Sequence, residues 1–272
     1  MRSGWMFKKL FALGAALLLC LPLAAQAGSR QQALDAALSR HGEAVTFVLV
    51  DADSGETLAY NRKRAATPYL PASTFKFVNS LLALDYGVVP SADAVFWHYD
   101  GRPVFLAAWK QDMNLGQAFA ASNVPAFQQI ARAIGPKRMQ SGLDRLGYGN
   151  RDIGPAVDNF WLEGGALRIS ANEQAAFLAR LARGRLPLPA AVQASVRGIA
   201  LKESGDGWRL YGKTGWSGRQ LPSVGWFAGW VEQGGKAYAF ALNMEVAGGR
   251  MDELPKREAL AREALAALGL AI

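Results

Sequence analysis

The spacing of apolar residues differs between the two ends of this chain and its middle. Short runs rich in β-branched and aromatic residues are typical of strands, and they lie at Val45–Val50, Thr57–Tyr60, Trp208–Tyr211, Val224–Val231 and Tyr238–Met244. Asp53-Ser54-Gly55 and Gly234-Gly235 separate neighbouring runs and predict hairpin turns. The two ends of the chain are therefore predicted to share one antiparallel sheet.

Between these strands the apolar residues recur every three or four positions, which predicts helices. The predicted helices are Phe75–Leu84, Leu115–Ala121, Pro125–Ile134, Lys137–Leu146 and Ala171–Ala182, with terminal helices at Ser29–Arg40 and Lys256–Leu268. We therefore expect an α/β domain from residues 28–72 and 206–272, into which a mainly helical domain, residues 73–205, is inserted. The active site is expected at their interface.

The first 27 residues have the composition of an export signal. The basic residues in this segment are Arg2, Lys8 and Lys9. An apolar run at Leu10–Leu23 follows, and Ala25-Gln26-Ala27 forms a small-residue cleavage site. Because the run is short for a membrane span, we expect cleavage before Gly28, release into the periplasm and no stable membrane anchor.

Composition excludes several classes of function for the mature chain. Cys20 is the single cysteine and leaves with the signal, so no disulfide and no cysteine-based zinc site is expected. The net charge of +8 falls to +5 on cleavage, and the basic residues are interspersed with acidic ones along the chain. The densest basic run, Arg62-Lys63-Arg64, is interpreted as a solvated loop rather than a nucleic-acid site. Mild basicity suits a small anionic substrate instead.

Ser73-Thr74-Phe75-Lys76 is the first candidate for chemistry. It lies where a proline-containing loop enters an apolar helix, so the serine and the lysine three residues later share one helix face. A hydroxyl beside an amine is a nucleophile beside a base. Alone, the pattern is equally consistent with an N-cap serine and a solvated lysine.

Two further short motifs change this interpretation. Ser122-Asn123-Val124 lies between two predicted helices, and Lys213-Thr214-Gly215 ends the strand that begins at Trp208 or continues it. Either motif alone is an ordinary cap or turn. Ser-x-x-Lys followed about 140 residues later by Lys-Thr-Gly is the pattern of serine β-lactamases and penicillin-binding proteins.

The chain resembles the class D serine β-lactamases, the oxacillinases, over nearly all of the mature sequence. The middle motif is Ser-x-Val rather than Ser-Asp-Asn. The segments that carry the resemblance are Pro71–Phe77, Ser122–Ala131, Tyr148–Asn150, Phe160–Gly164 and Lys213–Gly218. The resemblance implies the serine β-lactamase fold, an antiparallel sheet flanked by terminal helices with an inserted helical domain. It also implies hydrolysis of the β-lactam amide of penicillin-type antibiotics through a serine acyl-enzyme.

The serine needs a base, and the chain offers few. His41 and His98 are the two histidines, and neither is placed to serve Ser73. A lysine titrates near pH ~10.4 unless burial disfavours its cation. The apolar residues expected to surround Lys76 are Phe75, Phe77, Val124 and Trp161.

The resemblance implies how these residues act together. Lys76 is expected to react with carbon dioxide, become N6-carboxylysine and act as general base for acylation and deacylation. Trp161 would hold that carbamate through its indole N–H, and Val124 belongs to the same catalytic group. Ser122 would pass a proton to the departing ring nitrogen, and the backbone N–H groups of Ser73 and Trp216 would stabilise the oxyanion.

The substrate carboxylate is expected at the late strand. Lys213, Thr214 and Gly215 would bind it together with Trp216, and Arg257 matches the second carboxylate anchor of the family, with Arg250 as the alternative. Glu163, Asp152 and Asp158 are interpreted as structural or solvated acids, and no metal site is expected.

Two other interpretations share this fold class. A β-lactam sensor domain, or a D,D-transpeptidase or carboxypeptidase, would acylate but deacylate slowly; a noncatalytic peptidoglycan-binding module is a more distant alternative. The sequence leaves open a homodimer, the preferred β-lactams and the turnover of carbapenems.

Overall fold

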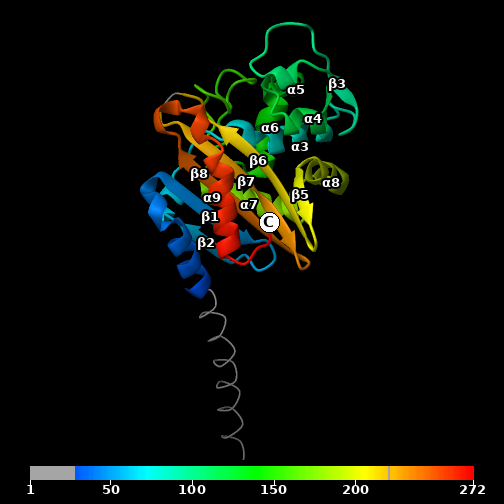
Figure 1. Ribbon diagram of the computed structural model, residues 1–272. Coiled ribbons are helices and arrows are strands. Elements are labelled where there is room, and N and C mark those ends of the chain that lie inside the picture. Colours follow the sequence, from blue (N-terminus) through cyan, green and yellow to red (C-terminus); the bar gives the residue numbers. More distant parts are fainter. Residues whose placement is uncertain (1–27, 220) are drawn as a thin grey trace, which may run out of the picture.

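A computed structural model describes residues 28–219 and 221–272 (Figure 1). The export signal predicted at 1–27 lies outside these residues. Within the described part of the chain, no helix is both long enough and apolar enough to cross a membrane.

Six antiparallel strands form the main sheet, in the order β2-β1-β8-β7-β6-β5. Their bounds are β1 Val45–Asp51, β2 Thr57–Tyr60, β5 Leu201–Gly205, β6 Trp208–Trp216, β7 Val224–Gln233 and β8 Lys236–Glu245. Strand β1 pairs with β8, so the first hairpin of the chain joins its last strand. The predicted sheet shared by both ends is confirmed.

The predicted helices of the middle are also present, each within two residues of its expected bounds. They are α3 Lys76–Asp85, α4 Leu115–Ala120, α5 Val124–Ile134, α6 Pro136–Leu146 and α7 Ala171–Ala182, and α9 Lys256–Ala267 ends the fold. Residues 28–38 are helical and continue into the 3-10 helix η1, Ser39–Ala44. The elements not predicted are α2 Arg62–Ala66, α8 Ala190–Ile199, the edge strand β5 and a small β3–β4 pair, Val95–Trp97 with Met113–Asn114.

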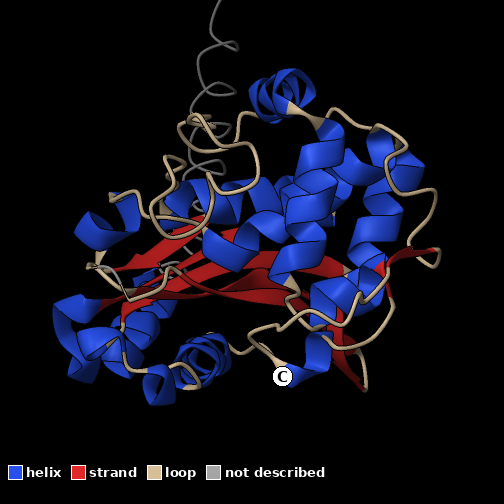
Figure 2. Ribbon diagram, turned by 90° about the horizontal axis from the view of Figure 1, so that it is seen from above, coloured by secondary structure: helices blue, strands red, loops and turns tan. Residues whose placement is uncertain are grey.

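Helices cover both faces of the sheet (Figure 2). Successive side chains of a strand point to opposite faces, so each strand can bury apolar residues under both layers of helices. In β7, Trp226 and Trp230 belong to the core beneath the inserted helices, whereas Phe227 and Val231 belong to the core shared with α9 and the N-terminal helix. Both faces are apolar, which explains the nearly continuous apolar run of this strand.

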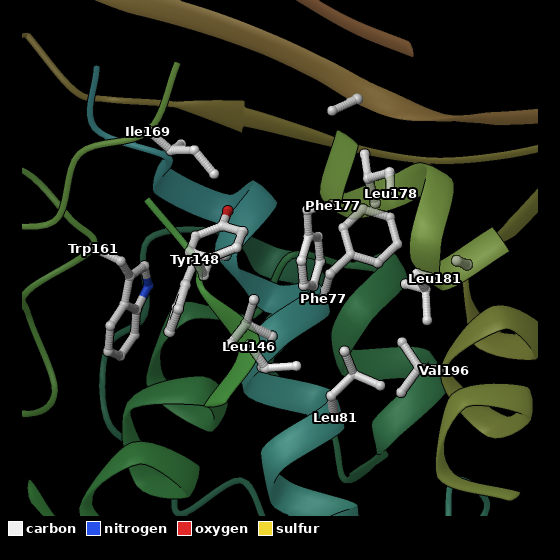
Figure 3. Packing of buried hydrophobic residues seen from close by; sticks show 14 of the residues in the cluster. Phe77, Leu81, Leu146, Tyr148, Trp161, Ile169, Phe177, Leu178, Leu181 and Val196 are labelled. Carbon is white, nitrogen blue, oxygen red and sulfur yellow. The ribbon is translucent and has the colours of Figure 1, made fainter. Parts of the chain in front are cut away.

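Helix α7 links the sheet to the inserted helices. It packs across β8, β1 and β7, and Figure 3 shows Phe177, Leu178 and Leu181 projecting from it into the larger core. Its Ser170 N-cap forms a capping box with Glu173, which explains why the predicted start is correct. The domain boundaries at residues 72/73 and 205/206 stay a prediction.

The loop predicted for Arg62-Lys63-Arg64 is wrong, although Arg62 and Lys63 are exposed as expected. These residues form α2, which begins at the capping residue Asn61. Arg64 is buried, donates from Nε to Asn243 Oδ1 at 2.8 Å and lies 4.8 Å from the ring centroid of Tyr69. A basic run is therefore not always solvated, because a guanidinium can be buried where an amide oxygen and an aromatic face contact it.

Close contact between β6 and β7 gives a test of the packing. A Cβ built on Gly229 would lie 1.9 Å from the carbonyl oxygen of Tyr211. This oxygen belongs to the backbone of β6, so it cannot move away as a flexible side chain would. We expect Gly229→Ala to lower the free energy of unfolding by about 3 kcal/mol. Gly198, exposed in α8, is the control, because a Cβ added there has open space. Its alanine variant should raise the free energy of unfolding by about 0.5 to 1 kcal/mol. Urea unfolding measures both, and an unchanged midpoint in Gly229→Ala would contradict the packing.

Candidate active site

Ser73 lies in a tight turn that enters α3. The turn is the 3-10 helix η2, Ala72–Phe75, and Ala72 has φ of 50°, an uncommon conformation for a residue with a Cβ. Lys76 starts α3, and its Nζ donates to Ser73 Oγ at 2.9 Å. The three-residue spacing therefore does bring the amine onto the hydroxyl, as expected from the motif.

Lys76 is fully buried. Burial lowers the pKa of its amine well below the ordinary value, and the cation of Lys213 lowers it further. The ring of Phe127, on α5, lies 5.0 Å from Nζ. Phe127 was not among the apolar neighbours expected from the sequence; its position three residues after Val124 on one helix face was the available signal.

Trp161 lies beside the same turn. It is fully buried, its ring stacks on Phe75 with centroids 5.2 Å apart, and Figure 3 shows it on the same side of α3 as Tyr148. Among the described residues its Nε1 has no hydrogen-bond partner. A buried N–H without an acceptor costs free energy, so this indole is suited to an acceptor added later.

Ser122 lies between α4 and α5 with φ of 55°. Asn123 caps α5 by accepting from the backbone N–H of Ala126, which fixes the start of the helix and the position of Val124 as its first residue. On the other side, the indole of Trp109 donates to the carbonyl of Ala121 at 2.9 Å. The Ser-x-Val motif is thus held at both ends.

Strand β6 carries Lys213, Thr214 and Gly215, so this motif continues the strand rather than following it. A Cβ on Gly215 would lie 3.0 Å from the carbonyl oxygen of Pro71 and 3.2 Å from the backbone nitrogen of Thr74. Only glycine lets the strand approach the nucleophile turn this closely. The end of β6 therefore lies directly against η2.

Lys213 is buried and donates to the carbonyl of Thr214 at 3.1 Å. Burial, aided by the cation of Arg257, lowers the pKa of its amine to about 7. Arg257 Nη1 donates to the carbonyl of Gly215 at 2.9 Å, whereas Arg250 is exposed and paired with Asp252. The structure brings Arg257 to the Lys-Thr-Gly segment and leaves Arg250 in solvent.

The remaining polar candidates lie apart from this cluster. Asp158 pairs with Arg132, and Asp152 receives the backbone N–H of Gly154. His98 contacts Asp112, and His41 contacts Glu263. Glu163 lies beside Gly218, since a Cβ on that glycine would meet its carboxylate at 2.2 Å. In residues 28–219 and 221–272, no group of three or more His, Cys, Asp or Glu side chains could hold a metal.

Comparison with known proteins agrees with this arrangement. Residues 45–266 match the family model of the penicillin-binding protein transpeptidase domain. The chain is 40% identical to the β-lactamase OXA-5 of Pseudomonas aeruginosa, over 86% of each chain. It is 38% identical to OXA-48 of Klebsiella pneumoniae, over 94% of this chain and 97% of that one.

A solved structure shows the same fold. FUS-1 (OXA-85), a class D β-lactamase from Fusobacterium nucleatum subsp. polymorphum, superposes with a TM-score of 0.82 at 41% identity. The alignment covers 86% of this chain and 96% of that one. The chain belongs to the class D serine β-lactamases, and β-lactam hydrolysis is the activity of that family.

The lowered pKa of Lys213 can be tested through the pH dependence of the free energy of unfolding. Below pH 7 the folded and unfolded states both hold the proton, and between about 7 in the folded protein and ~10.4 in the unfolded chain only the unfolded state holds it. Stability therefore rises with pH in this window, by up to ~1.4 kcal/mol per unit. Lys213→Met should lower the slope by this amount and leave the part that the lowered pKa of Lys76 contributes, whereas exposed Lys110→Met should keep the full rise, as measured by urea unfolding at pH 7 to 10. Equal slopes in wild type and Lys213→Met would show that Lys213 stays charged.

Proposed function

We propose that this chain hydrolyses the β-lactam amide of penicillin-type antibiotics through an acyl-enzyme on Ser73, with Lys76 as the general base. The observation that carries the proposal is the 2.9 Å contact between Ser73 Oγ and the amine of a fully buried Lys76. A serine hydroxyl attacks an amide at neutral pH only when a base accepts its proton. Burial keeps that amine uncharged and so able to act.

Two features suit Lys76 to carboxylation by carbon dioxide. Its amine is buried and has a lowered pKa, and only a neutral amine adds carbon dioxide. Trp161 supplies a buried indole N–H that lacks an acceptor among the described residues. When present, the carbamate supplies a base whose pKa is better matched to neutral pH than that of a free amine.

In the acylation step, Ser73 Oγ bonds to the lactam carbonyl carbon as its proton passes to the base at Lys76. The backbone N–H groups of Ser73 and Trp216 receive the developing oxyanion, because the Gly215 approach holds β6 against η2. The carbon–nitrogen bond then breaks, and Ser122 passes a proton to the ring nitrogen. Deacylation repeats the proton transfer with water in place of serine, at the base that Val124, Phe127 and Trp161 shield from solvent.

The substrate carboxylate is assigned to the end of β6. Lys213 and Thr214 lie on this strand, and Arg257 reaches it through its bond to the Gly215 carbonyl. Arg257 is therefore proposed as the second anchor, in preference to Arg250. Lys213, which is only partly charged near pH 7, becomes fully charged when a carboxylate binds, since an opposite charge favours the cation.

We also propose export to the periplasm through cleavage of residues 1–27. The sequence pattern alone supports this, and the same holds for release from the membrane. A homodimer is compatible with the exposed edge strand β5, where Leu201 is exposed.

The first test is turnover of a chromogenic cephalosporin by the purified mature protein. We expect multiple turnovers and a higher rate when bicarbonate is added after acid decarboxylation. Lys76→Ala should lose at least ~1,000-fold in deacylation, because water then lacks its base. Stoichiometric labelling without turnover would instead indicate a sensor or a transpeptidase.

Trp161→Phe tests the role of the indole N–H while the aromatic packing is kept. We expect deacylation to slow by about tenfold or more, acylation to slow less, and the bicarbonate concentration for half-maximal activity to rise; tenfold corresponds to ~1.4 kcal/mol. Trp230→Phe is the matched control. The indole of Trp230 is also buried and lacks a hydrogen-bond partner among the described residues, but it lies on β7 rather than beside the Ser73 turn. If both variants slow both steps equally, the Trp161 indole serves only packing.

A further inference from the structure

An indole on the sheet forms a hydrogen bond to the turn that carries Ser73. Trp226, fully buried on β7, donates its Nε1 proton to the carbonyl of Leu70 at 2.9 Å. Leu70 lies three residues before Ser73. We propose that Trp226 is a positioning residue, which sets the height of the nucleophile turn above β6 and so the spacing of the two oxyanion donors. This inference rests on the proposed roles of Ser73 and Trp216.

The register of the sheet places this bond at the catalytic end of β6. Trp226 pairs with Gly215 across the β6–β7 ladder, and Gly215 is the residue that packs against Pro71 and Thr74. The same stretch of sheet therefore contacts the turn twice, once through the backbone at Gly215 and once through the indole. One contact limits how close the turn comes, and the other limits how far it moves away.

The segment before the nucleophile is held on its other side as well. Tyr69 exchanges two backbone hydrogen bonds with Ile169, each 2.9 Å long. Between Tyr69 and Ser73, the strained Ala72 leaves the turn dependent on its surroundings, since a positive φ persists only where neighbouring contacts enforce it. Within this stretch, the Leu70 carbonyl receives the side chain of Trp226 from the sheet, while the Pro71 carbonyl is bound locally by the hydroxyl of Thr74.

A hydrogen bond of this kind acts through geometry. The two N–H groups stabilise an oxyanion only when both lie within hydrogen-bond distance of it. If the turn rises from the sheet, Ser73 and its N–H move together with Lys76, while the N–H of Trp216 stays with β6. Loss of the indole bond should therefore weaken both chemical steps and leave the Ser73–Lys76 pair intact.

Trp226→Phe removes the N–H and keeps an aromatic ring in the core. We expect the acylation and deacylation rate constants, measured by stopped flow with a penicillin, to fall together by about tenfold, less than the ~100-fold or greater loss on deleting a donor outright. The bicarbonate dependence should stay that of wild type. Trp230→Phe, on the same face of β7, should keep wild-type rates.

A spectroscopic readout separates positioning from a general loss of stability. In rapid-scan infrared difference spectra of the acyl-enzyme, the ester carbonyl stretch should shift to higher frequency in Trp226→Phe, because a weaker oxyanion hole polarises the carbonyl less. It should not shift in Trp230→Phe, even at an equal loss of melting temperature. If Trp226→Phe does not fold, benzothienylalanine at position 226 removes only the N–H and is measured in the same way.

Mass spectrometry of the penicillin adduct distinguishes a failure of the positioning role of Trp226 from a failure of the proposed function of Ser73. An adduct on Ser73 that forms at equal rates in wild type and Trp226→Phe, with an unshifted carbonyl stretch, overturns the positioning role alone. An adduct on a residue other than Ser73 in the wild-type protein overturns the proposed function itself.

Discussion

The proposed chemistry depends on keeping the Lys76 amine uncharged at neutral pH next to a serine hydroxyl. Water stabilises an ammonium ion strongly, so an amine loses its charge only where burial removes that stabilisation. The fold favours this by starting α3 with Lys76 inside the core, where the amine is fully buried. The pKa of Lys213 is also lowered, and in its charged form this lysine opposes protonation of Lys76.

The sheet and the inserted helices contribute different parts of the chemistry. In the proposed mechanism, the helical part supplies Ser73, Lys76 and Ser122, whereas β6 supplies Trp216 and the residues assigned to the substrate carboxylate. Such a division requires the two groups of elements to be held at a fixed separation. Gly215 permits the contact and the Trp226 indole bond maintains it, so residues with no chemistry of their own determine whether the reacting groups meet.

Much of the architecture could be predicted from the sequence because local signals agreed with the final packing. The hairpin at Asp53-Ser54-Gly55 and the capped helix α7 follow ordinary turn and capping rules. Strand β5 could not be predicted, because an exposed edge strand shows no apolar alternation. Nor could α2, since the burial of Arg64 depends on Asn243, 179 residues away along the chain.

The candidate site followed from motifs, but its supporting residues did not. Ser-x-x-Lys gives the contact of Ser73 with Lys76 through helix geometry alone. The contact of Phe127 with Lys76 and the bond from Trp226 to Leu70 arise only when distant segments meet, and helix spacing after Val124 points to Phe127 alone. The choice of Arg257 over Arg250 likewise needed the contact with the Gly215 carbonyl.

The most direct test of this account is a titration of Lys76 itself in buffer free of carbon dioxide. Lysine labelled with ¹³C at Cε reports the protonation of its own amine by NMR, and the Lys76→Arg variant assigns the signal. We predict a Lys76 pKa well below the ordinary value of ~10.4, with the amine largely neutral at the pH of turnover. A Lys76 signal that stays in its protonated position up to pH 10 would contradict the account.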